Sequence, residues 1–197
     1  LGKGQFDYFS EASAADADHG AAGKGGGSGF GAWILQADGL LEEAGQGRII
    51  GAASYNPFRI EESVRDVERG VKEYGFKYVW FHPLSFGLAP NDRRFYPLYA
   101  KCVELDVAFQ TQVGNTGPLF PSETGRPTYI DQVALDFPEL RIICGHIGWP
   151  WTEEMISVAY RFPNVYIAPD AHAPKYWEPR FVDYLRTRGK RKVLFGT

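Results

Sequence analysis

The stretch IICGHIGWPWTEE, residues 142–154, decides how this chain folds. A short apolar run ends at a single histidine, His146, and a turn rich in glycine, tryptophan and proline separates it from a pair of acidic residues. An apolar run of four to eight residues that turn residues enclose is typical of a buried strand. The stretch therefore predicts a strand, a loop and a helix, with His146 where the strand ends.

The same alternation of strand and helix continues along the chain. Strands are predicted at 48–55, 77–82, 107–113, 141–146, 165–169 and 192–196, and helices near 33–46, 59–75, 96–105, 129–137, 152–162 and 175–188. The helix over 59–75 has the clearest pattern, because apolar residues recur every three or four positions from Ile60 until Gly75 can cap it. Strands that helical crossovers join run parallel, so the fold class is α/β with a parallel sheet.

Two architectures match this alternation, an open doubly wound sheet and a (β/α)8 barrel. Polar residues that could carry function follow five of the strands: Asn56, His82, Gln112 with Asn115, His146, and Asp170 with His172. This distribution favours the barrel, in which every βα loop contributes to one face.

A doubly wound sheet would instead concentrate its signal at one glycine-rich turn after a strand. Gly27, Gly29 and Ala32 match a dinucleotide-binding fingerprint only loosely, and no strand is predicted before them. We therefore expect a TIM-barrel-like (β/α)8 fold that is incomplete, with about six βα units and with the first strand missing or replaced.

Composition indicates one globular domain. The 197 residues are 44% hydrophobic and 15% aromatic, enough to build a core. Residues 1–31 are Gly-rich and lack a hydrophobic period, so we expect a flexible arm there and a partial barrel domain over 32–197. The chain starts at Leu1 and stops at Thr197 directly after a predicted strand, which suggests a piece of a longer protein.

Charge and cysteine content exclude several classes of partner. A net charge of −3 and the absence of a Lys/Arg run interleaved with aromatic residues argue against nucleic acid. No stretch approaches the roughly 20 apolar residues of a membrane helix, so no membrane partner is expected. Cys102 and Cys144 lie in apolar stretches and form no CxxC pair, which predicts buried thiols and a cytoplasmic location.

From about residue 48 onward, the sequence resembles a known family. The blocks that carry the resemblance are RIIGAASYNP, GFKYVWFHP, NDRRFYPLYAKCVELDVAFQTQVG, PTYIDQVALDFPELRIICGHIGWPWTEE, RFPNVYIAPDAH and RKVLFGT. They resemble the amidohydrolase-related family (amidohydrolase family 2) of metal-dependent (β/α)8 enzymes, which includes small-acid lactonases and decarboxylases of aromatic and carboxymuconate-semialdehyde acids. The resemblance implies such an enzyme here.

The resemblance also implies a metal site that this chain does not complete. Family members hold one divalent metal, usually zinc, with a His-x-His pair on the first strand, often a histidine on the fifth strand, and an aspartate after the last. No His-x-His occurs in this chain. Gln112 occupies the position of the family's fifth-strand histidine, and the sequence stops at Thr197, before the position of the family's aspartate. His146 matches a further histidine on the sixth strand, and with Asp170 it is the predicted ligand set.

His146 is the predicted catalytic residue. A histidine has a near-neutral pKa, and this one ends a parallel strand at the face where barrels place their chemistry. Substrate contacts are predicted from His82, Gln112, Trp149 and His172. Together with Trp151 and Trp177, Trp149 can wall a pocket for an aromatic or planar substrate, and the three can equally pack a lid over this face.

Each of these residues also has a plainer structural interpretation. His82 can simply hydrogen-bond a loop at the end of its strand. Asp170 and His172 can cap the helix that begins near residue 174. Glu153 and Glu154 fall in the first turn of a helix, where negative charge suits the helix dipole, and we take them as structural.

The leading functional prediction is hydrolysis of a lactone, ester or amide in a small carboxylated substrate by metal-activated water. The alternative is non-oxidative decarboxylation of an aromatic or muconate-type acid at the same site. A third reading is an inactive fragment without a metal site, for which zinc would bind only weakly.

The missing first strand has a consequence for association. A barrel closes by pairing its first and last strands, so a chain without the first strand leaves an open edge. We expect the Gly-rich arm and the helix from about Ala32 to cover this gap, or the chain to associate with another copy as a homo-oligomer.

Overall fold

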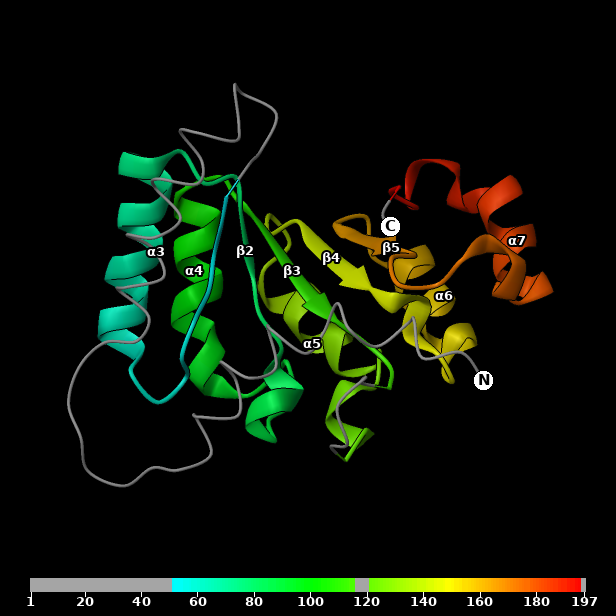
Figure 1. Cartoon of the computed structure of the whole chain (residues 1–197), viewed down its shortest axis with the longest axis horizontal. Helices are drawn as coiled ribbons and strands as arrows, with labels where there is room; N and C mark the ends of the chain where they lie inside the picture. The colour runs from blue at the N-terminus through cyan, green and yellow to red at the C-terminus, as the bar shows by residue number, and fades with distance from the viewer. Residues whose placement is uncertain (1–50, 116–120, 196–197) are drawn as a thin grey trace, which may run out of the picture.

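The computed structural model describes residues 51–115 and 121–195, and it contains one parallel sheet. Its five strands are β1 (Ala52–Ala53), β2 (Tyr78–Trp80), β3 (Ala108–Gln112), β4 (Ile142–Gly145) and β5 (Val165–Ala168). They lie in sequence order, and every neighbouring pair is parallel (Figure 1). The predicted parallel α/β architecture is therefore confirmed.

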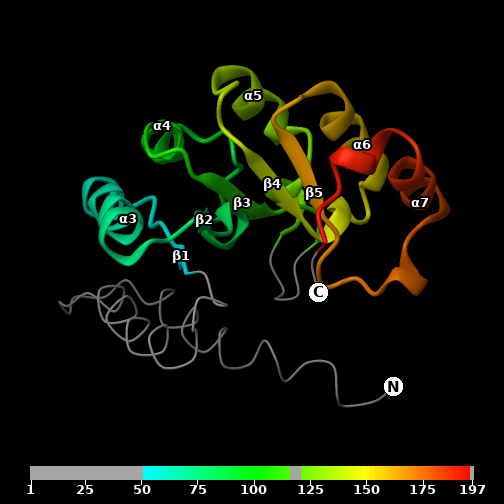
Figure 2. The ribbon, with the colours of Figure 1, turned by 90° about the horizontal axis from the view of Figure 1, so that it is seen from above.

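A helix follows each strand. These helices are α3 (Ile60–Tyr74), α4 (Tyr96–Glu104), α5 (Tyr129–Asp136), α6 (Thr152–Arg161) and α7 (Pro179–Arg186). Seen from above, they lie along the outer side of an arc of strands (Figure 2). This is the layering of a TIM-barrel-like fold. The described residues form five of its βα units, so the barrel is incomplete over these residues.

Strand alternation separates the two faces of the sheet. One row, Val79, Phe109, Ile142 and Val165, is in register across four strands and fully buried. The ring of Phe109 lies 5.0 Å from that of Tyr99 on α4, so this face packs against the helices. The core therefore lies between the sheet and its outer layer of helices.

The neighbouring row, which alternation turns to the opposite face, is less buried. It consists of Trp80, Gln110, Ile143 and Tyr166, again in register across the four strands. Trp80 keeps 44% of its surface exposed. No described helix covers this side of the arc (Figure 2). In a closed barrel, this side of the strands faces the interior.

The predicted strand over 192–196 is wrong in length, although not in direction. Among the described residues 192–195, only Val193 forms a bridge, parallel to Ile167, and Leu194 donates to the Ile167 carbonyl at 2.8 Å. Phe195 is 93% exposed. Because the segment pairs with β5 through a single bridge, it does not form a sixth strand of the sheet over its described residues.

The predicted helix over 175–188 is also wrong as a single element. The structure has a 3₁₀ turn at Pro174–Tyr176, α7 from Pro179, and a second 3₁₀ turn at Arg188–Arg191. Pro179 lacks a backbone N–H and so belongs in the first turn of a helix, which is where α7 begins.

Other predictions fall on residues that the structure does not describe. The arm over 1–31, the helix over 33–46 and residues 48–50 of the first predicted strand lie outside the described ranges. Within the described ranges, no helix has the length and apolar character needed to cross a membrane. The cytoplasmic location stays a prediction.

Candidate functional site

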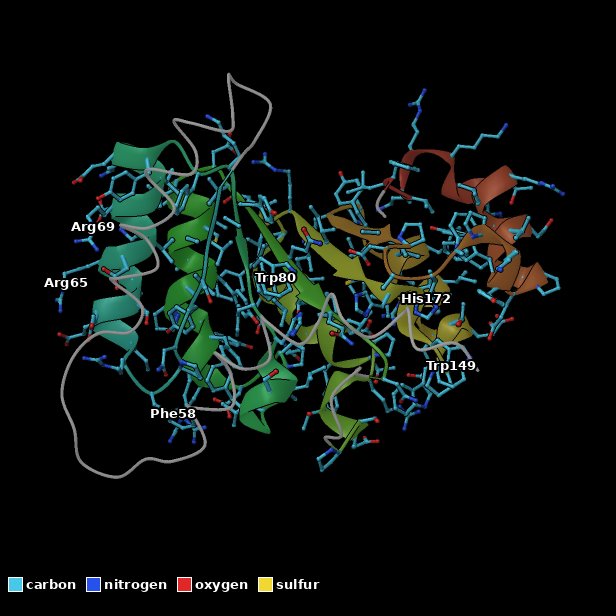
Figure 3. The ribbon with its side chains drawn as sticks, viewed as in Figure 1. Phe58, Arg65, Arg69, Trp80, Trp149 and His172 are labelled. Carbon is cyan, nitrogen blue, oxygen red and sulfur yellow. The ribbon has the colours of Figure 1, made fainter. Side chains whose placement is uncertain are left out.

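The carboxyl ends of three parallel strands bring histidines and a carboxylate to one edge of the sheet. His82 follows β2, His146 directly follows β4, and Asp170 and His172 follow β5. Figure 3 shows His172 and Trp149 near the ends of β4 and β5. Parallel strands present these ends at the same edge, which is the edge where barrel enzymes build their sites.

His146 and Asp170 are in direct contact. The backbone N–H of His146 donates to Asp170 Oδ1 at 2.8 Å, and the imidazole Nε2 lies 3.7 Å from the same oxygen. The other carboxylate oxygen accepts from Gln110 Nε2 at 3.4 Å. One carboxylate therefore connects the residues of β3, β4 and β5 at this edge.

Backbone conformation at the ends of β4 and β5 is unusual. His146 has φ 69°, Ile147 has φ 52° and Ala171 has φ 57°, all in the left-handed region. Such values are costly for residues other than glycine, and most of all for a β-branched one. Strained residues of this kind persist where surrounding contacts hold them, and they cluster at functional sites.

Burial keeps the three histidines neutral near pH 7. It lowers the pKa of His82 to about 4, with a further contribution from the charge of His146. Burial also lowers the pKa of His146 and of His172, while the nearby carboxylate of Asp170 opposes the shift in both. A neutral imidazole can accept a proton, so His146 has the protonation state of a general base.

The side chain of Gln112 is hydrogen-bonded to the loop that follows β3. Its side-chain N–H donates to the Asn115 carbonyl at 2.7 Å, and the residue is only 5% exposed. Gln110, two residues earlier on the same face, reaches Asp170 instead. Sequence reasoning missed Gln110, although strand alternation from Gln112 points to it.

The three tryptophans of the predicted pocket have different surroundings. Trp149 is 47% exposed, and Trp151 has the Arg126 guanidinium 5.6 Å above its ring. The indole N–H of Trp177 donates to the His172 carbonyl at 2.7 Å, and its ring packs edge-on against Phe181. These contacts of Trp177 match the packing alternative, since they hold the loop of His172 against the core.

The helix-capping alternative for Asp170 and His172 is also wrong. The 3₁₀ turn at Pro174–Tyr176 starts after Ala173 without a side-chain cap. Asp170 instead accepts from His146 and Gln110. The carboxylate therefore bonds donors on β3 and at the end of β4, and the turn at Pro174–Tyr176 has no side-chain cap.

The acidic pair that opens α6 has the structural role that we predicted. Glu153 pairs with Arg180 at 3.3 Å, and Glu154 accepts from the Arg126 guanidinium, including a 3.3 Å bond from Nε. Both glutamates lie in the first turn of the helix.

Two hollows lie outside the strand-end cluster. One of about 440 Å³ borders the start of α3, and one of about 540 Å³ lies between α6 and α7. None of the side chains that line them is a histidine. The substrate pocket that the sequence predicts beside Trp149 stays a prediction.

A comparison with known protein families agrees with the resemblance that the sequence blocks showed. The family model described as amidohydrolase matches residues 7–197. The chain belongs to the amidohydrolase family. No curated protein matches this amidohydrolase-family chain in a sequence comparison.

Solved structures share the amidohydrolase fold over most of this chain. An uncharacterised TIM-barrel protein from Bordetella bronchiseptica has 26% identity and a TM-score of 0.68, over 83% of this chain and 58% of that one. A 5-carboxyvanillate decarboxylase from Novosphingobium aromaticivorans, complexed with manganese and 4-hydroxy-3-methoxy-5-nitrobenzoic acid, has 19% identity and a TM-score of 0.61, over 84% and 59%. A 2,6-dihydroxybenzoate decarboxylase from Rhizobium has 16% identity and a TM-score of 0.62, over 84% and 64%. This amidohydrolase-family chain thus spans less than two thirds of each.

The described residues do not by themselves fit a metal ion. Over 51–115 and 121–195, no three His, Cys, Asp or Glu side chains converge closely enough to hold one. His146 and Asp170, the predicted ligands, lie together, but a catalytic metal takes about three protein ligands. Zinc in this amidohydrolase-family chain stays a prediction.

Proposed function

We propose that this chain hydrolyses a lactone, ester or amide bond in a small carboxylated substrate, with His146 as the general base. The observation that supports this most is the contact between His146 and Asp170 at the carboxyl edge of the sheet. Membership of the amidohydrolase family supports the reaction class.

The geometry suits proton transfer by His146. Neutral imidazole takes a proton from water as the water oxygen attacks the substrate carbonyl carbon, and the carboxylate of Asp170, 3.7 Å from Nε2, stabilises the imidazolium that forms. When the tetrahedral intermediate collapses, His146 returns the proton to the departing alcohol or amine. A general base of this kind contributes about 10²- to 10⁴-fold to the rate.

Four neighbouring side chains are proposed as substrate contacts. His82 and His172 flank His146, and their rings can donate hydrogen bonds to substrate oxygens. Trp149 offers an exposed aromatic surface for a planar group, and Gln112 lies on the same face at the end of β3. These contacts suit a small planar acid.

Decarboxylation is the second candidate. Two solved structures of the same fold are decarboxylases, and one is complexed with a nitrobenzoic acid. In that reaction a protonated His146 would donate to the carbon that loses CO₂. The lowered pKa of His146 disfavours the protonated form at pH 7, and for that reason we place hydrolysis first.

A substrate panel tests the proposal. The purified chain is assayed with carboxylated lactones, esters and amides by proton release, and with hydroxybenzoates by CO₂ release. We expect hydrolysis, and a loss of about 100-fold in kcat with His146→Asn. Asp183→Asn is the control, because Asp183 is an exposed residue on α7.

The outcomes separate the three readings of the sequence. CO₂ release without hydrolysis would replace the leading proposal with decarboxylation. Absence of turnover with both groups of substrates would overturn both enzyme proposals and favour the inactive fragment.

A further inference from the structure

We infer that Asp170 is a positioning residue for His146. Its carboxylate holds the turn after β4 in the one conformation that brings the imidazole to the carboxyl edge of the sheet. The catalytic consequence rests on the proposed function, but the positioning itself is a property of the fold and is tested separately.

The first argument is the hydrogen bond to the His146 backbone. Gly145 pairs with Ala168 in the last register pair between β4 and β5, so His146 is the first residue beyond the ladder. Its N–H has lost the regular partner that a strand provides. Asp170 Oδ1 accepts this N–H at 2.8 Å and supplies the missing partner from the next strand.

The second argument is the strain in the same turn. His146 and Ile147 both have positive φ, and Gly148 follows with φ 76°. Two successive non-glycine residues in this region need contacts that hold them there. The bond from Asp170 fixes the first of them, while the turn closes more loosely by a 3.5 Å bond from the Trp149 N–H to the His146 carbonyl.

The third argument is how the carboxylate itself is held. Its second oxygen accepts from Gln110 Nε2 at 3.4 Å, so β3 orients the group from the other side. A Cβ at Gly145 would lie 3.1 Å from Oδ1 and 3.4 Å from Oδ2. The carboxylate therefore packs against a bare Cα, and a Cβ at residue 145 would force it to shift by a few tenths of an ångström.

Together these contacts give Asp170 a positioning role beside the metal-ligand role that the sequence analysis predicted for it. Both of its oxygens accept hydrogen bonds from protein donors on β3 and at the end of β4. The acceptor is 24 residues from His146 in sequence, so the bond orients one strand end relative to the next.

Amide hydrogen exchange measured by ¹⁵N NMR on the whole chain tests the positioning without any substrate. We expect Asp170→Ala to raise the exchange rate of the His146 amide by about tenfold or more, and the control Asp183→Ala to leave it unchanged. Asp170→Asn keeps one acceptor oxygen and should raise the rate less.

Gly145→Ala provides a variant that removes no polar group. It should displace the carboxylate and raise the same exchange rate, which keeps the test valid if Asp170→Ala fails to fold. A His146 amide that exchanges as fast in the unaltered chain as in Asp170→Asn and Gly145→Ala would overturn the inference.

Kinetics then test the catalytic consequence. Asp170→Asn should lower kcat by about tenfold to 100-fold with little change in KM and an unchanged thermal midpoint. Adding Gln110→Glu to that variant supplies a carboxylate that can accept from the new side-chain amide at position 170, and it should restore part of kcat. If the unaltered chain turns nothing over, the proposed function fails while the exchange result still decides the positioning.

Discussion

At the residue scale, burial changes the proton affinity of His82. Its ring is largely enclosed at the end of β2, with the Trp80 ring 4.3 Å away, and burial lowers its pKa from 6.5 to about 4. An imidazole in this position is neutral in the folded chain but becomes protonated in the unfolded chain as pH falls below 6.5. The residue therefore links stability to pH.

The chain should lose stability on acidification. Between pH 6.5 and about 4 the unfolded chain binds a proton at His82 that the folded chain does not, so the free energy of unfolding falls as pH falls through this window. The full loss from this group is about 3 kcal/mol, and it is absent above pH 6.5. Urea denaturation at a series of pH values measures it.

A variant assigns this pH dependence to the residue. His82→Gln should flatten the dependence, and the more exposed His172, changed to Gln, should flatten it less. An identical pH slope in His82→Gln and the unaltered chain would contradict the prediction.

At the scale of elements, the loops after β3 and β4 hold each other in place. The N–H of Asn115 donates to the Trp149 carbonyl at 2.8 Å, and the N–H of Gly114 donates to the Gly125 carbonyl at 2.8 Å. Gly114 has φ 89°, and a Cβ there would lie 2.4 Å from the Trp149 carbonyl oxygen. Glycine is thus required both by conformation and by close approach of two backbones.

Gly114→Ala should destabilise the chain by about 3 kcal/mol, because it adds a backbone clash to left-handed strain. Gly87→Ala is the matched control, since Gly87 has φ 66° but open space around its Cβ position. The control should cost only about 1 kcal/mol. Equal losses in urea denaturation would show that the clash is relieved by movement of the loop.

Asn164 joins helix α5 to strand β5. Its side-chain N–H₂ donates to the carbonyls of Phe137 at 3.0 Å and Leu140 at 3.1 Å, just past the end of the helix. Asn164→Ala should lower the free energy of unfolding by about 2 kcal/mol, since the buried Leu140 carbonyl loses this donor and the Phe137 carbonyl keeps only the Leu140 N–H at 3.0 Å. Gln132→Ala, on the exposed face of α5, should change it by less than about 0.5 kcal/mol in the same denaturation series.

At the scale of the whole molecule, the prediction about association concerns the open side of the sheet. The face that carries Trp80, Ile143 and Tyr166 has no described helix over it, and β1 pairs only with β2 among the described strands. The sequence predicts that the Gly-rich arm over 1–31 and the helix from about Ala32 cover the open edge of the barrel, or that the chain associates with another copy. Removing residues 1–50 should therefore increase dye binding and light scattering relative to the whole chain, as exposed apolar strand faces do.

The same comparison shows how the prediction could fail. Equal dye binding and equal mass by light scattering, at the same protein concentration, would mean that the first fifty residues do not protect the face.

Metal binding also belongs to the whole molecule, because ligands must come from several strands. Only His146 and Asp170 meet among the predicted ligands, and no set of three converges in the described ranges. Zinc should therefore bind the chain with a dissociation constant weaker than about 1 µM. Stoichiometric sub-micromolar binding in isothermal titration, lost with His146→Ala, would contradict this.

The sequence by itself determined the parallel order of the strands, the bounds of α3 and the position of His146 at the end of β4. These features depend on hydrophobic period and on turn residues, which act over a few neighbouring positions. The family resemblance also identified Gln112 as a candidate site residue. Side chains alternate along β3, so Gln110 lies on the same face as Gln112.

Only the tertiary structure decided which partners these residues have. Asp170 accepts from His146, 24 residues away, and from Gln110, 60 residues away, while the indole N–H of Trp177 donates to the His172 carbonyl. The predicted last strand shortens to one bridge at Val193 for the same reason, since a strand needs a neighbour along its length. Register between strands and left-handed turns at their ends select such contacts, and neither is encoded in the local spacing of residue types.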